Sequence, residues 1–185
     1  YIADVPTSGD LDVTTLGPLI ADIMPEECIV SDESATSSLI VTPHALQAKP
    51  HDCLALTGGS IGQGLPLAIG ASIAKPDRPV ITLHGDGGAM YTIQALWTQA
   101  RENLNITNII FSNRSYEILK IELDRVQAVE TGERAASMFS MDNPPIDWVN
   151  LAESMGVQGY KPKTVKEFKD VFSKSVNESG PSLIE

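Results

Sequence analysis

Short apolar runs rich in isoleucine, valine and leucine alternate with segments of helical period along the whole chain. Strands that are apolar on both faces and separated by helices are typical of a parallel sheet covered on each side. We therefore predict an α/β fold with three layers, a doubly wound and mostly parallel six-stranded sheet with helices on both faces. The expected strands are 28–32, 53–57, 79–84, 107–113, 157–161 and 182–185, and the expected helices are 12–24, 34–46, 64–75, 88–103, 146–155 and 164–177.

The length of the chain favours one domain. A chain of 185 residues can hide roughly 70% of its unfolded surface around a single core, so we expect residues 1–185 to form one unit. Because the sequence starts at Tyr1 and stops on the expected strand 182–185, we also expect it to be a piece of a longer polypeptide.

Charge and hydropathy exclude several classes of partner. A formal net charge of -11 makes a nucleic-acid backbone or an anionic membrane surface a poor partner. The longest nearly apolar run, LPLAIGASIA, has about half the length that spans a bilayer. Cys28 and Cys53 each lie in a short apolar run and are expected to be buried free thiols. We therefore expect a soluble cytoplasmic protein.

Glycine and polar residues follow four of the expected strands, in the turns 31–36, 58–62, 85–88 and 113–116. In a parallel sheet, ligands bind beyond the carboxyl ends of the strands. Glycines let backbone amides approach a ligand, and helix N-termini carry partial positive charge, so such turns suit a phosphate group. Each could also be an ordinary strand-to-helix turn, but four at one edge favour a site.

The two common phosphate-binding signatures are absent from these turns. No lysine follows a glycine turn as a P-loop requires, and GGSIGQG lacks the glycine spacing of a dinucleotide fingerprint. Basic residues are also scarce, because between Thr57 and Tyr116 only Arg114 lies in one of the turns. A di- or triphosphate held beside Asp86 would therefore need a cation.

Asp86 and Asn113 can supply the ligands for that cation. Their carboxylate and amide oxygens are hard donors suited to Mg²⁺, which usually takes further oxygens from phosphates and water. Asn113 follows Asp86 by 27 positions (113 − 86 = 27), the length of a helix of about four turns plus a strand. One β-α-β unit thus brings both residues to the same crevice.

The sequence GDG followed by asparagine at this distance resembles the thiamine diphosphate motif of the decarboxylase and acetolactate synthase superfamily. The run TGGSIGQGLPLAIGASIA resembles the segment under the thiamine ring, and SDESATSS resembles the turn that contacts the diphosphate. In length and order, nearly the whole chain resembles the C-terminal, diphosphate-binding domain of these enzymes.

The resemblance implies a role for each matching position. Asp86, the side-chain oxygen of Asn113 and the backbone carbonyl of Ser115 would bind Mg²⁺, while Gly59 would accept a hydrogen bond from the aminopyrimidine and Ile61 would support the bent cofactor. The amides of Gly87 and Gly88, with Thr36 or Ser34, would hold the diphosphate. The full expected set of cofactor contacts is Ser34, Thr36, Gly59, Ser60, Ile61, Gly85, Asp86, Gly87, Gly88, Asn113, Ser115 and Tyr116.

Two positions depart from the pattern of the superfamily. Many relatives carry two consecutive asparagines where this chain has Ser112 and Asn113. Pyruvate decarboxylases carry an acidic residue where this chain has Leu119. Ile118 and Leu119 would instead form an apolar wall of the substrate pocket, as in benzoylformate decarboxylases and acetolactate synthases.

The resemblance also implies a missing part. In this superfamily a catalytic glutamate comes from a separate N-terminal, pyrimidine-binding domain, and Glu33 and Glu117 attach to the wrong turns to replace it. We expect an enzyme that decarboxylates a 2-oxo acid, as a lyase or transferase, in a homodimer or tetramer. The isolated chain should not turn over substrate. The alternative is a catalytically silent domain of the same fold that binds a nucleotide or a partner.

Other conspicuous residues are expected to be structural. His84 is expected to make a structural hydrogen bond, with contact to the cofactor or substrate as the alternative. Trp97 is expected to pack in the core because it lies in a helix of apolar period. The lysines near the C-terminus are expected to form a solvated helix face opposite Phe168 and Phe172. The polar segment 130–146 is expected to be mobile, either folding over the site or linking two elements.

Overall fold

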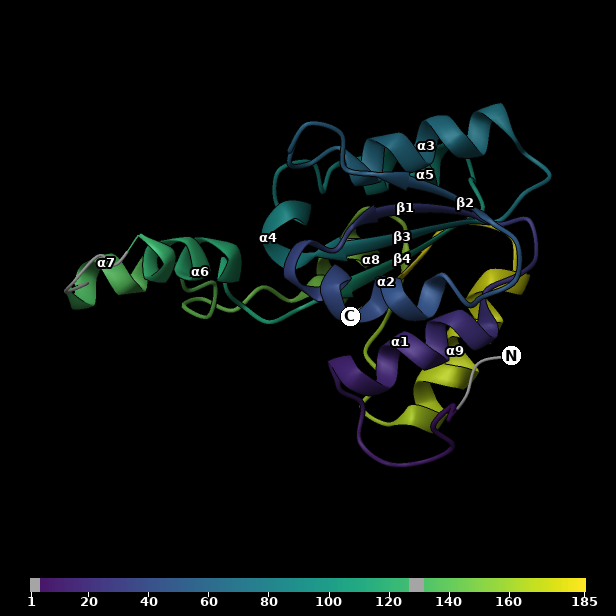
Figure 1. Cartoon of the computed structure of the whole chain (residues 1–185). Coiled ribbons are helices and arrows are strands. Elements are labelled where there is room, and N and C mark those ends of the chain that lie inside the picture. Colours follow the sequence, from purple (N-terminus) through teal and green to yellow (C-terminus); the bar gives the residue numbers. More distant parts are fainter. Residues whose placement is uncertain (1–3, 127–131) are drawn as a thin grey trace.

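A single six-stranded sheet, with every strand parallel to its neighbours, forms the centre of the protein (Figure 1). The computed structural model describes residues 4–126 and 132–185. The spatial order is β2-β1-β3-β4-β6-β5, so the prediction of a doubly wound α/β fold is confirmed and the described strands are all parallel. The strands are β1 (Ile29–Glu33), β2 (Asp52–Ala55), β3 (Val80–Gly85), β4 (Ile106–Phe111), β5 (Gln158–Tyr160) and β6 (Ser182–Ile184).

Helices cover both faces of the sheet. One apolar cluster joins one face to α1, α2 and α9, and a second cluster joins the other face to α3, α4, α5 and α8 (Figure 1). The two clusters give the three layers that the sequence predicts. The helices are α1 (Val13–Ile23), α2 (Ser38–Ala45), α3 (Gly64–Ala74), α4 (Asp86–Ala89), α5 (Ala95–Arg101), α6 (Glu117–Arg125), α7 (Glu133–Ser137), α8 (Trp148–Ser154) and α9 (Val165–Asn177), with a 3-10 turn η1 (Ala35–Ser37).

Local sequence explains where helices α1 and α9 begin. Asp12 and Thr164 each form a capping box at the start of α1 and α9, which satisfies amide groups that have no helical partner. In α9, Phe168 and Phe172 are buried and Lys166 and Lys174 are exposed. The prediction of a solvated lysine face on this helix is therefore confirmed.

The predicted helix 88–103 is wrong in detail, because it is broken between α4 and α5. Residues 90–94 form turns with short-range bonds such as Thr92 N–H to Ala89 O and Ala95 N–H to Thr92 O, both at i to i+3. These turns rotate α5 relative to α4, so the side chain of Trp97 is 53% exposed, not in the core as predicted. Its ring lies under the Arg101 guanidinium, 5.0 Å from the ring centre.

The helix pair α6 and α7 was not predicted from the sequence. It stands off the body of the protein, and no residue of these two helices in the described part of the chain is buried (Figure 1). Within the segment 130–146, residues 130 and 131 lie outside the described residues, and the rest contains α7 and a turn. The expected mobility of this segment stays a prediction.

The two cysteines have different surroundings. Cys28 is buried as predicted, and burial raises the pKa of its thiol to about 11. Cys53 is exposed, against the prediction, because β2 is the edge strand of the sheet. None of the described helices is long and apolar enough to cross a membrane.

Candidate functional site

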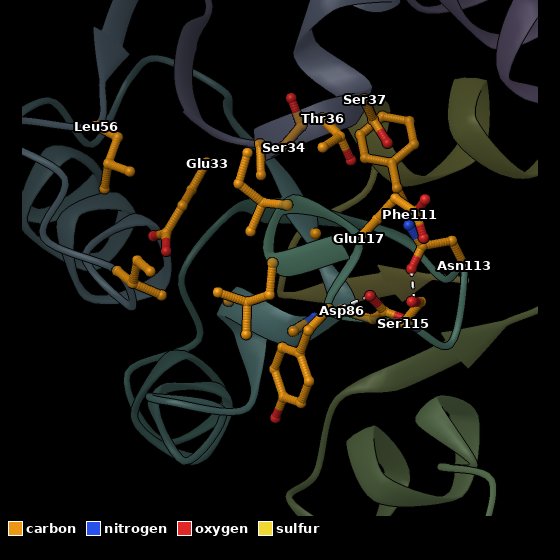
Figure 2. Close-up of a pocket in the computed structure, with 18 of the residues that line it drawn as sticks. Glu33, Ser34, Thr36, Ser37, Leu56, Asp86, Phe111, Asn113, Ser115 and Glu117 are labelled. Carbon is orange, nitrogen blue, oxygen red and sulfur yellow. Dashed lines mark hydrogen bonds between the residues drawn. The ribbon is translucent and has the colours of Figure 1, made fainter. Parts of the chain in front are cut away.

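A cavity opens at the carboxyl edge of the sheet, where the chain changes direction. β2 lies on one side of β1 and β3 on the other, so the connections diverge between β1 and β3, and this is where doubly wound sheets bind ligands. Figure 2 shows the side chains that surround the cavity. Its lining residues come from the ends of β1, β3 and β4, from the turn before α3 and from the start of α6.

Most of the residues predicted for the site line this one cavity. Gly59 and Ser60 do not line it, since they lie exposed on the turn just before Ile61. The predicted residues among the lining are Ser34, Thr36, Ile61, Gly85, Asp86, Gly87, Gly88, Asn113, Ser115, Tyr116, Ile118 and Leu119. The lining residues outside the predicted set of contacts are Glu33, Ala35, Ser37, Leu56, Tyr91, Phe111 and Glu117.

Oxygen donors gather at one end of the cavity. Asp86 is 3% exposed, and its two carboxylate oxygens accept hydrogen bonds from the amides of Gly87 at 2.9 Å and Arg114 at 2.6 Å. Asn113 Oδ1 accepts from the Ser115 amide at 2.9 Å. Asp86, Asn113 and Ser115 lie close together in Figure 2. Each of these side-chain oxygens keeps a second lone pair for a further partner.

The electrostatics of this end favour a bound cation. Burial raises the pKa of Asp86, although the two amide hydrogen bonds oppose that shift. The cavity lining contains three acidic residues, Glu33, Asp86 and Glu117, and no lysine, arginine or histidine among the described residues. The side chain of Arg114 forms an exposed ion pair with Asp142 at 2.9 Å instead. An anionic ligand here would therefore depend on a cation from solution.

The donor set fits Mg²⁺ better than a softer metal. In the described part of the chain, no three His, Cys, Asp or Glu side chains are grouped to hold a metal ion. One carboxylate, one amide oxygen and one backbone carbonyl leave half of the about six positions around Mg²⁺ to a ligand's phosphates and to water.

The hydroxyl groups after β1 are not equivalent. Ser34 Oγ donates to Asp32 Oδ1 at 2.6 Å, and the Ser34 amide donates to the same oxygen at 2.9 Å. The hydroxyl hydrogen of Ser34 is therefore already used, and its oxygen can only accept. Of the two hydroxyls predicted to hold a diphosphate, Thr36 is the better candidate for donating to an anion.

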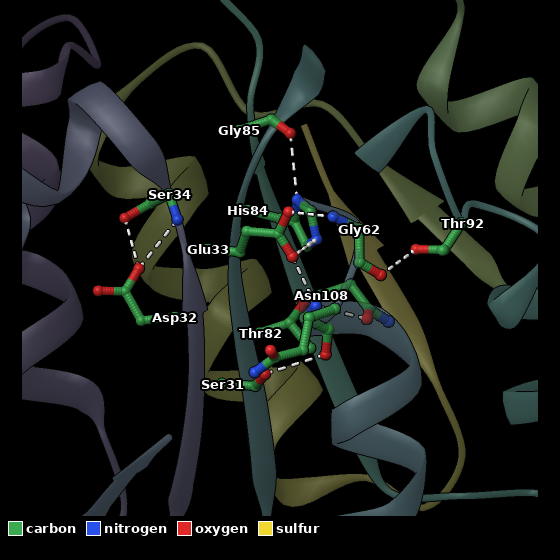
Figure 3. Close-up of polar contacts among 12 residues, drawn as sticks. Ser31, Asp32, Glu33, Ser34, Gly62, Thr82, His84, Gly85, Thr92 and Asn108 are labelled. Atoms are coloured by element: carbon green, nitrogen blue, oxygen red, sulfur yellow. Dashed lines mark hydrogen bonds and ion pairs between the residues drawn. The ribbon is translucent and has the colours of Figure 1, made fainter. Parts of the chain in front are cut away.

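Glu33 is the main site residue that sequence reasoning passed over. It ends β1 and is 4% exposed, and its carboxylate accepts hydrogen bonds from the amides of Gly62 and Gly64, each at 2.5 Å (Figure 3). Its Oε2 lies 3.2 Å from Nε2 of His84, which is also buried. Burial raises the pKa of Glu33, but His84 and the two amides outweigh it and hold that pKa below its ordinary value.

The structural role predicted for His84 is confirmed. Its Nδ1 lies 3.1 Å from the carbonyl oxygen of Gly85, and its other ring nitrogen faces Glu33 (Figure 3). His84 does not line the cavity.

Two glycines of α3 provide a matched test of this packing. A methyl group at Gly64 would lie 2.9 Å from the His84 ring and 3.0 Å from the Glu33 carboxylate, so Gly64→Ala should lower the free energy of unfolding by about 1–3 kcal/mol. A methyl group at Gly70 would meet nothing within 4 Å, so Gly70→Ala should raise it by about 0.5–1 kcal/mol. Urea unfolding measures both. Equal effects at the two positions would contradict the close contact at Gly64.

Fold and cavity together define a class of protein. It is an α/β domain whose ligand site lies at the carboxyl edge of a parallel sheet, between two glycine-rich turns. Residues 35–185 match the family described as thiamine pyrophosphate enzyme, C-terminal TPP binding domain. The chain belongs to this family, and thiamine pyrophosphate is the compound called thiamine diphosphate above. The resemblance seen in the sequence is confirmed.

Three similar proteins share this domain. IlvX of Mycobacterium tuberculosis, provisionally named an acetolactate synthase large subunit, is 44% identical over 182 residues, 98% of this chain and 35% of that protein. Benzoylformate decarboxylase of Pseudomonas aeruginosa is 28% identical over 177 residues, 96% of this chain and 32% of that protein. The structure of thiamine diphosphate-dependent 4-hydroxybenzoylformate decarboxylase from Rhodococcus jostii RHA1 matches with a TM-score of 0.83 at 31% identity, covering 100% of this chain and 34% of that one. The chain thus spans about a third of the length of these relatives.

Proposed function

We propose that this chain is the thiamine diphosphate- and Mg²⁺-binding domain of an enzyme that decarboxylates a 2-oxo acid and can join the product to a second carbonyl compound. One observation carries the proposal: an open cavity that includes the glycine turn 85–88, has oxygen donors at one end and has no basic residue in its described lining. A divalent cation would offset the repulsion between a diphosphate and Asp86 in such a cavity. The names of the relatives support a decarboxylase or an acetolactate synthase.

The proposed metal ligands are Asp86, Asn113 Oδ1 and the backbone carbonyl of Ser115. The amide of Gly88 at the start of α4 would donate to the diphosphate together with Thr36, and the amide of Gly87 would join them by turning its hydrogen away from Asp86 Oδ1, which it now contacts at 2.9 Å. Gly85 and Tyr116 flank this group. When bound, the thiazolium ring of the cofactor supplies an electron sink for decarboxylation.

The other end of the cavity would hold the rings of the cofactor. Ile61 lines it and would support the bent cofactor, while Gly59 would accept a hydrogen bond from the aminopyrimidine, with Ser60 beside it. Ile118 and Leu119 from α6 would form an apolar wall that keeps water from the 2-oxo acid.

The remainder of the active site is proposed to lie outside this chain. The chain covers about a third of its relatives, so we propose that residues 1–185 are one domain of a longer cytoplasmic enzyme, a lyase or a transferase. A pyrimidine-binding domain N-terminal to it would supply the catalytic glutamate, with a homodimer or tetramer bringing the two together. The chain alone would then bind the cofactor without turning over substrate.

Isothermal titration calorimetry tests the proposal. Thiamine diphosphate should bind this chain in the presence of Mg²⁺ and not in the presence of EDTA, and thiamine without the diphosphate should not bind in either case. A catalytically silent nucleotide-binding domain would instead prefer ADP. Binding that is equal with and without the metal would contradict the metal bridge.

A further inference from the structure

Glu33 and His84 form a buried pair between two glycine-rich turns. β1 and β3 are neighbours, and their register places these two residues side by side at the carboxyl ends of the strands. Glu33 is 4% exposed and His84 is 0% exposed. A carboxylate in such a position must have hydrogen-bond donors, because an unpartnered buried charge is costly.

The first of the two turns, residues 58–63, supplies those donors. Its Gly62 amide donates to one oxygen of the carboxylate (Figure 3), and the Gly64 amide at the start of α3 donates to the other. On its other side the turn is held by Thr92, whose hydroxyl donates to the Gly62 carbonyl oxygen at 2.7 Å. Gly62 has a φ of +90°, a conformation that favours glycine, so this turn has a specific shape that these bonds hold in place.

The second turn, residues 85–88, packs against the same pair. A methyl group at Gly88 would lie 3.0 Å from Glu33 Oε1 and 3.1 Å from the His84 ring, and His84 Nδ1 lies 3.1 Å from the Gly85 carbonyl oxygen. The glycines at positions 64 and 88 thus make room for the Glu33 and His84 side chains. Both turns are therefore fixed to one buried element.

We propose that Glu33 is a positioning residue that fixes the turn carrying Gly59 and Ile61 relative to the turn carrying Asp86 and Gly88. The inference rests on the proposed function, since these two turns would hold the rings and the diphosphate of the cofactor. Each carboxylate oxygen of Glu33 is already bonded to a backbone amide. Glu33 therefore sets the distance between the two ends of the site in advance.

Amide hydrogen exchange in the 185-residue chain without cofactor tests the anchoring itself. Glutamine has one carbonyl oxygen where glutamate has two, so in Glu33→Gln one of the Gly62 and Gly64 amides should lose its acceptor and exchange on the order of tenfold faster. The matched control is Ser31→Ala, which removes a buried hydrogen bond to the carbonyl oxygen of Gly64 at 2.9 Å and leaves both amides with their acceptor. Unchanged exchange at both amides in Glu33→Gln would overturn the proposal.

A pair of ligands tests the positioning. In the presence of Mg²⁺, Glu33→Gln should weaken the binding of thiamine diphosphate on the order of tenfold and leave the binding of inorganic pyrophosphate unchanged. Only thiamine diphosphate would need both turns at the correct distance from each other. Equal weakening of both ligands would indicate a general loss of structure and would overturn the proposal. Thr92→Val releases the same turn from its other side and leaves the pair of Glu33 and His84 in place, so it should give the same split even if Glu33→Gln does not fold.

Failure of the proposed function can be told apart from failure of the positioning role of Glu33. If the unmodified chain binds neither ligand with Mg²⁺, the proposed function fails. The exchange rates of the Gly62 and Gly64 amides still decide whether Glu33 anchors the turn.

Discussion

Replacing Asp86 by asparagine should weaken the binding of thiamine diphosphate in the presence of Mg²⁺ by about 100-fold or more. Asp86 is the one buried carboxylate at the oxygen-donor end of the cavity, and no basic side chain in the described lining could replace the charge of a metal ion. Removal of groups that merely support metal ligands costs about 10–100-fold in affinity, so loss of a direct, charged ligand should cost at least as much. Calorimetric titration of Asp86→Asn with thiamine diphosphate and Mg²⁺ measures the loss.

The fold should survive this substitution. Burial raises the pKa of Asp86, which means that its charge is unfavourable in the folded chain without a cation. Asparagine keeps one oxygen to accept from the Gly87 or Arg114 amide, so the unfolding midpoint without ligand should be equal or higher. If Asp86→Asn lowers the midpoint strongly, the lost binding would reflect unfolding and not a lost ligand.

Asp142→Asn is the matched control for charge. It also removes one negative charge close to the Arg114 turn, but Asp142 is exposed and does not line the cavity. The affinity of the Asp142→Asn variant for the cofactor should stay within about twofold of that of the unmodified chain, because exposed charges are screened by salt. A similar loss in both variants would show that net charge, and not coordination by Asp86, controls binding.

The sheet could be predicted because each strand carries its own signal. The apolar runs at 79–84 and 107–113 are short, β-branched and flanked by turns, and they became the two central strands β3 and β4 with bounds shifted by one or two residues. The site followed from topology, since parallel strands bring the turns after β3 and β4 to one edge. Asp86 and Asn113 could therefore be paired without knowledge of any contact.

The role of Glu33 could not be predicted from the sequence in the same way. Its role depends on the register of β1 against β3, which places it beside His84, and on a turn 29 residues further along that supplies the Gly62 amide. No local sequence pattern indicates either the register of the two strands or that long-range contact. The glycines at 64 and 88 were visible, but a sequence does not reveal whether a missing side chain makes room for a ligand or for a buried neighbour.

The error at Trp97 has a specific cause. A continuous period of 3.6 residues through 88–103 places Trp97 on the same face as Leu96, but the tight turns at 90–94 leave α5 with only Ala95, Leu96 and Gln99 buried. The break at 90–94 contains no glycine or proline, and it includes Thr92, whose hydroxyl donates to the carbonyl oxygen of Gly62.

Truncation of one buried and one exposed aromatic residue should show how differently the two side chains contribute to stability. Phe172 is 0% exposed, lies with its ring centre 5.4 Å from that of Phe168 and belongs to the core between α9 and the sheet, so Phe172→Ala should cost about 3–5 kcal/mol. Since a domain is usually stable by about 5–15 kcal/mol, the midpoint of thermal unfolding should fall by about 10 °C. Differential scanning calorimetry measures this shift.

Trp97→Ala removes a larger ring but should cost less than about 1 kcal/mol. The ring is 53% exposed, and its described partner on the surface is the Arg101 guanidinium, a contact worth about 0.5–1 kcal/mol when exposed. If Trp97→Ala destabilised the chain as much as Phe172→Ala, the helix would be continuous through 88–103 with Trp97 in the core. The turn that holds Thr92 against Gly62 would then not exist, and the turn around Ile61 would lose one of its two anchors.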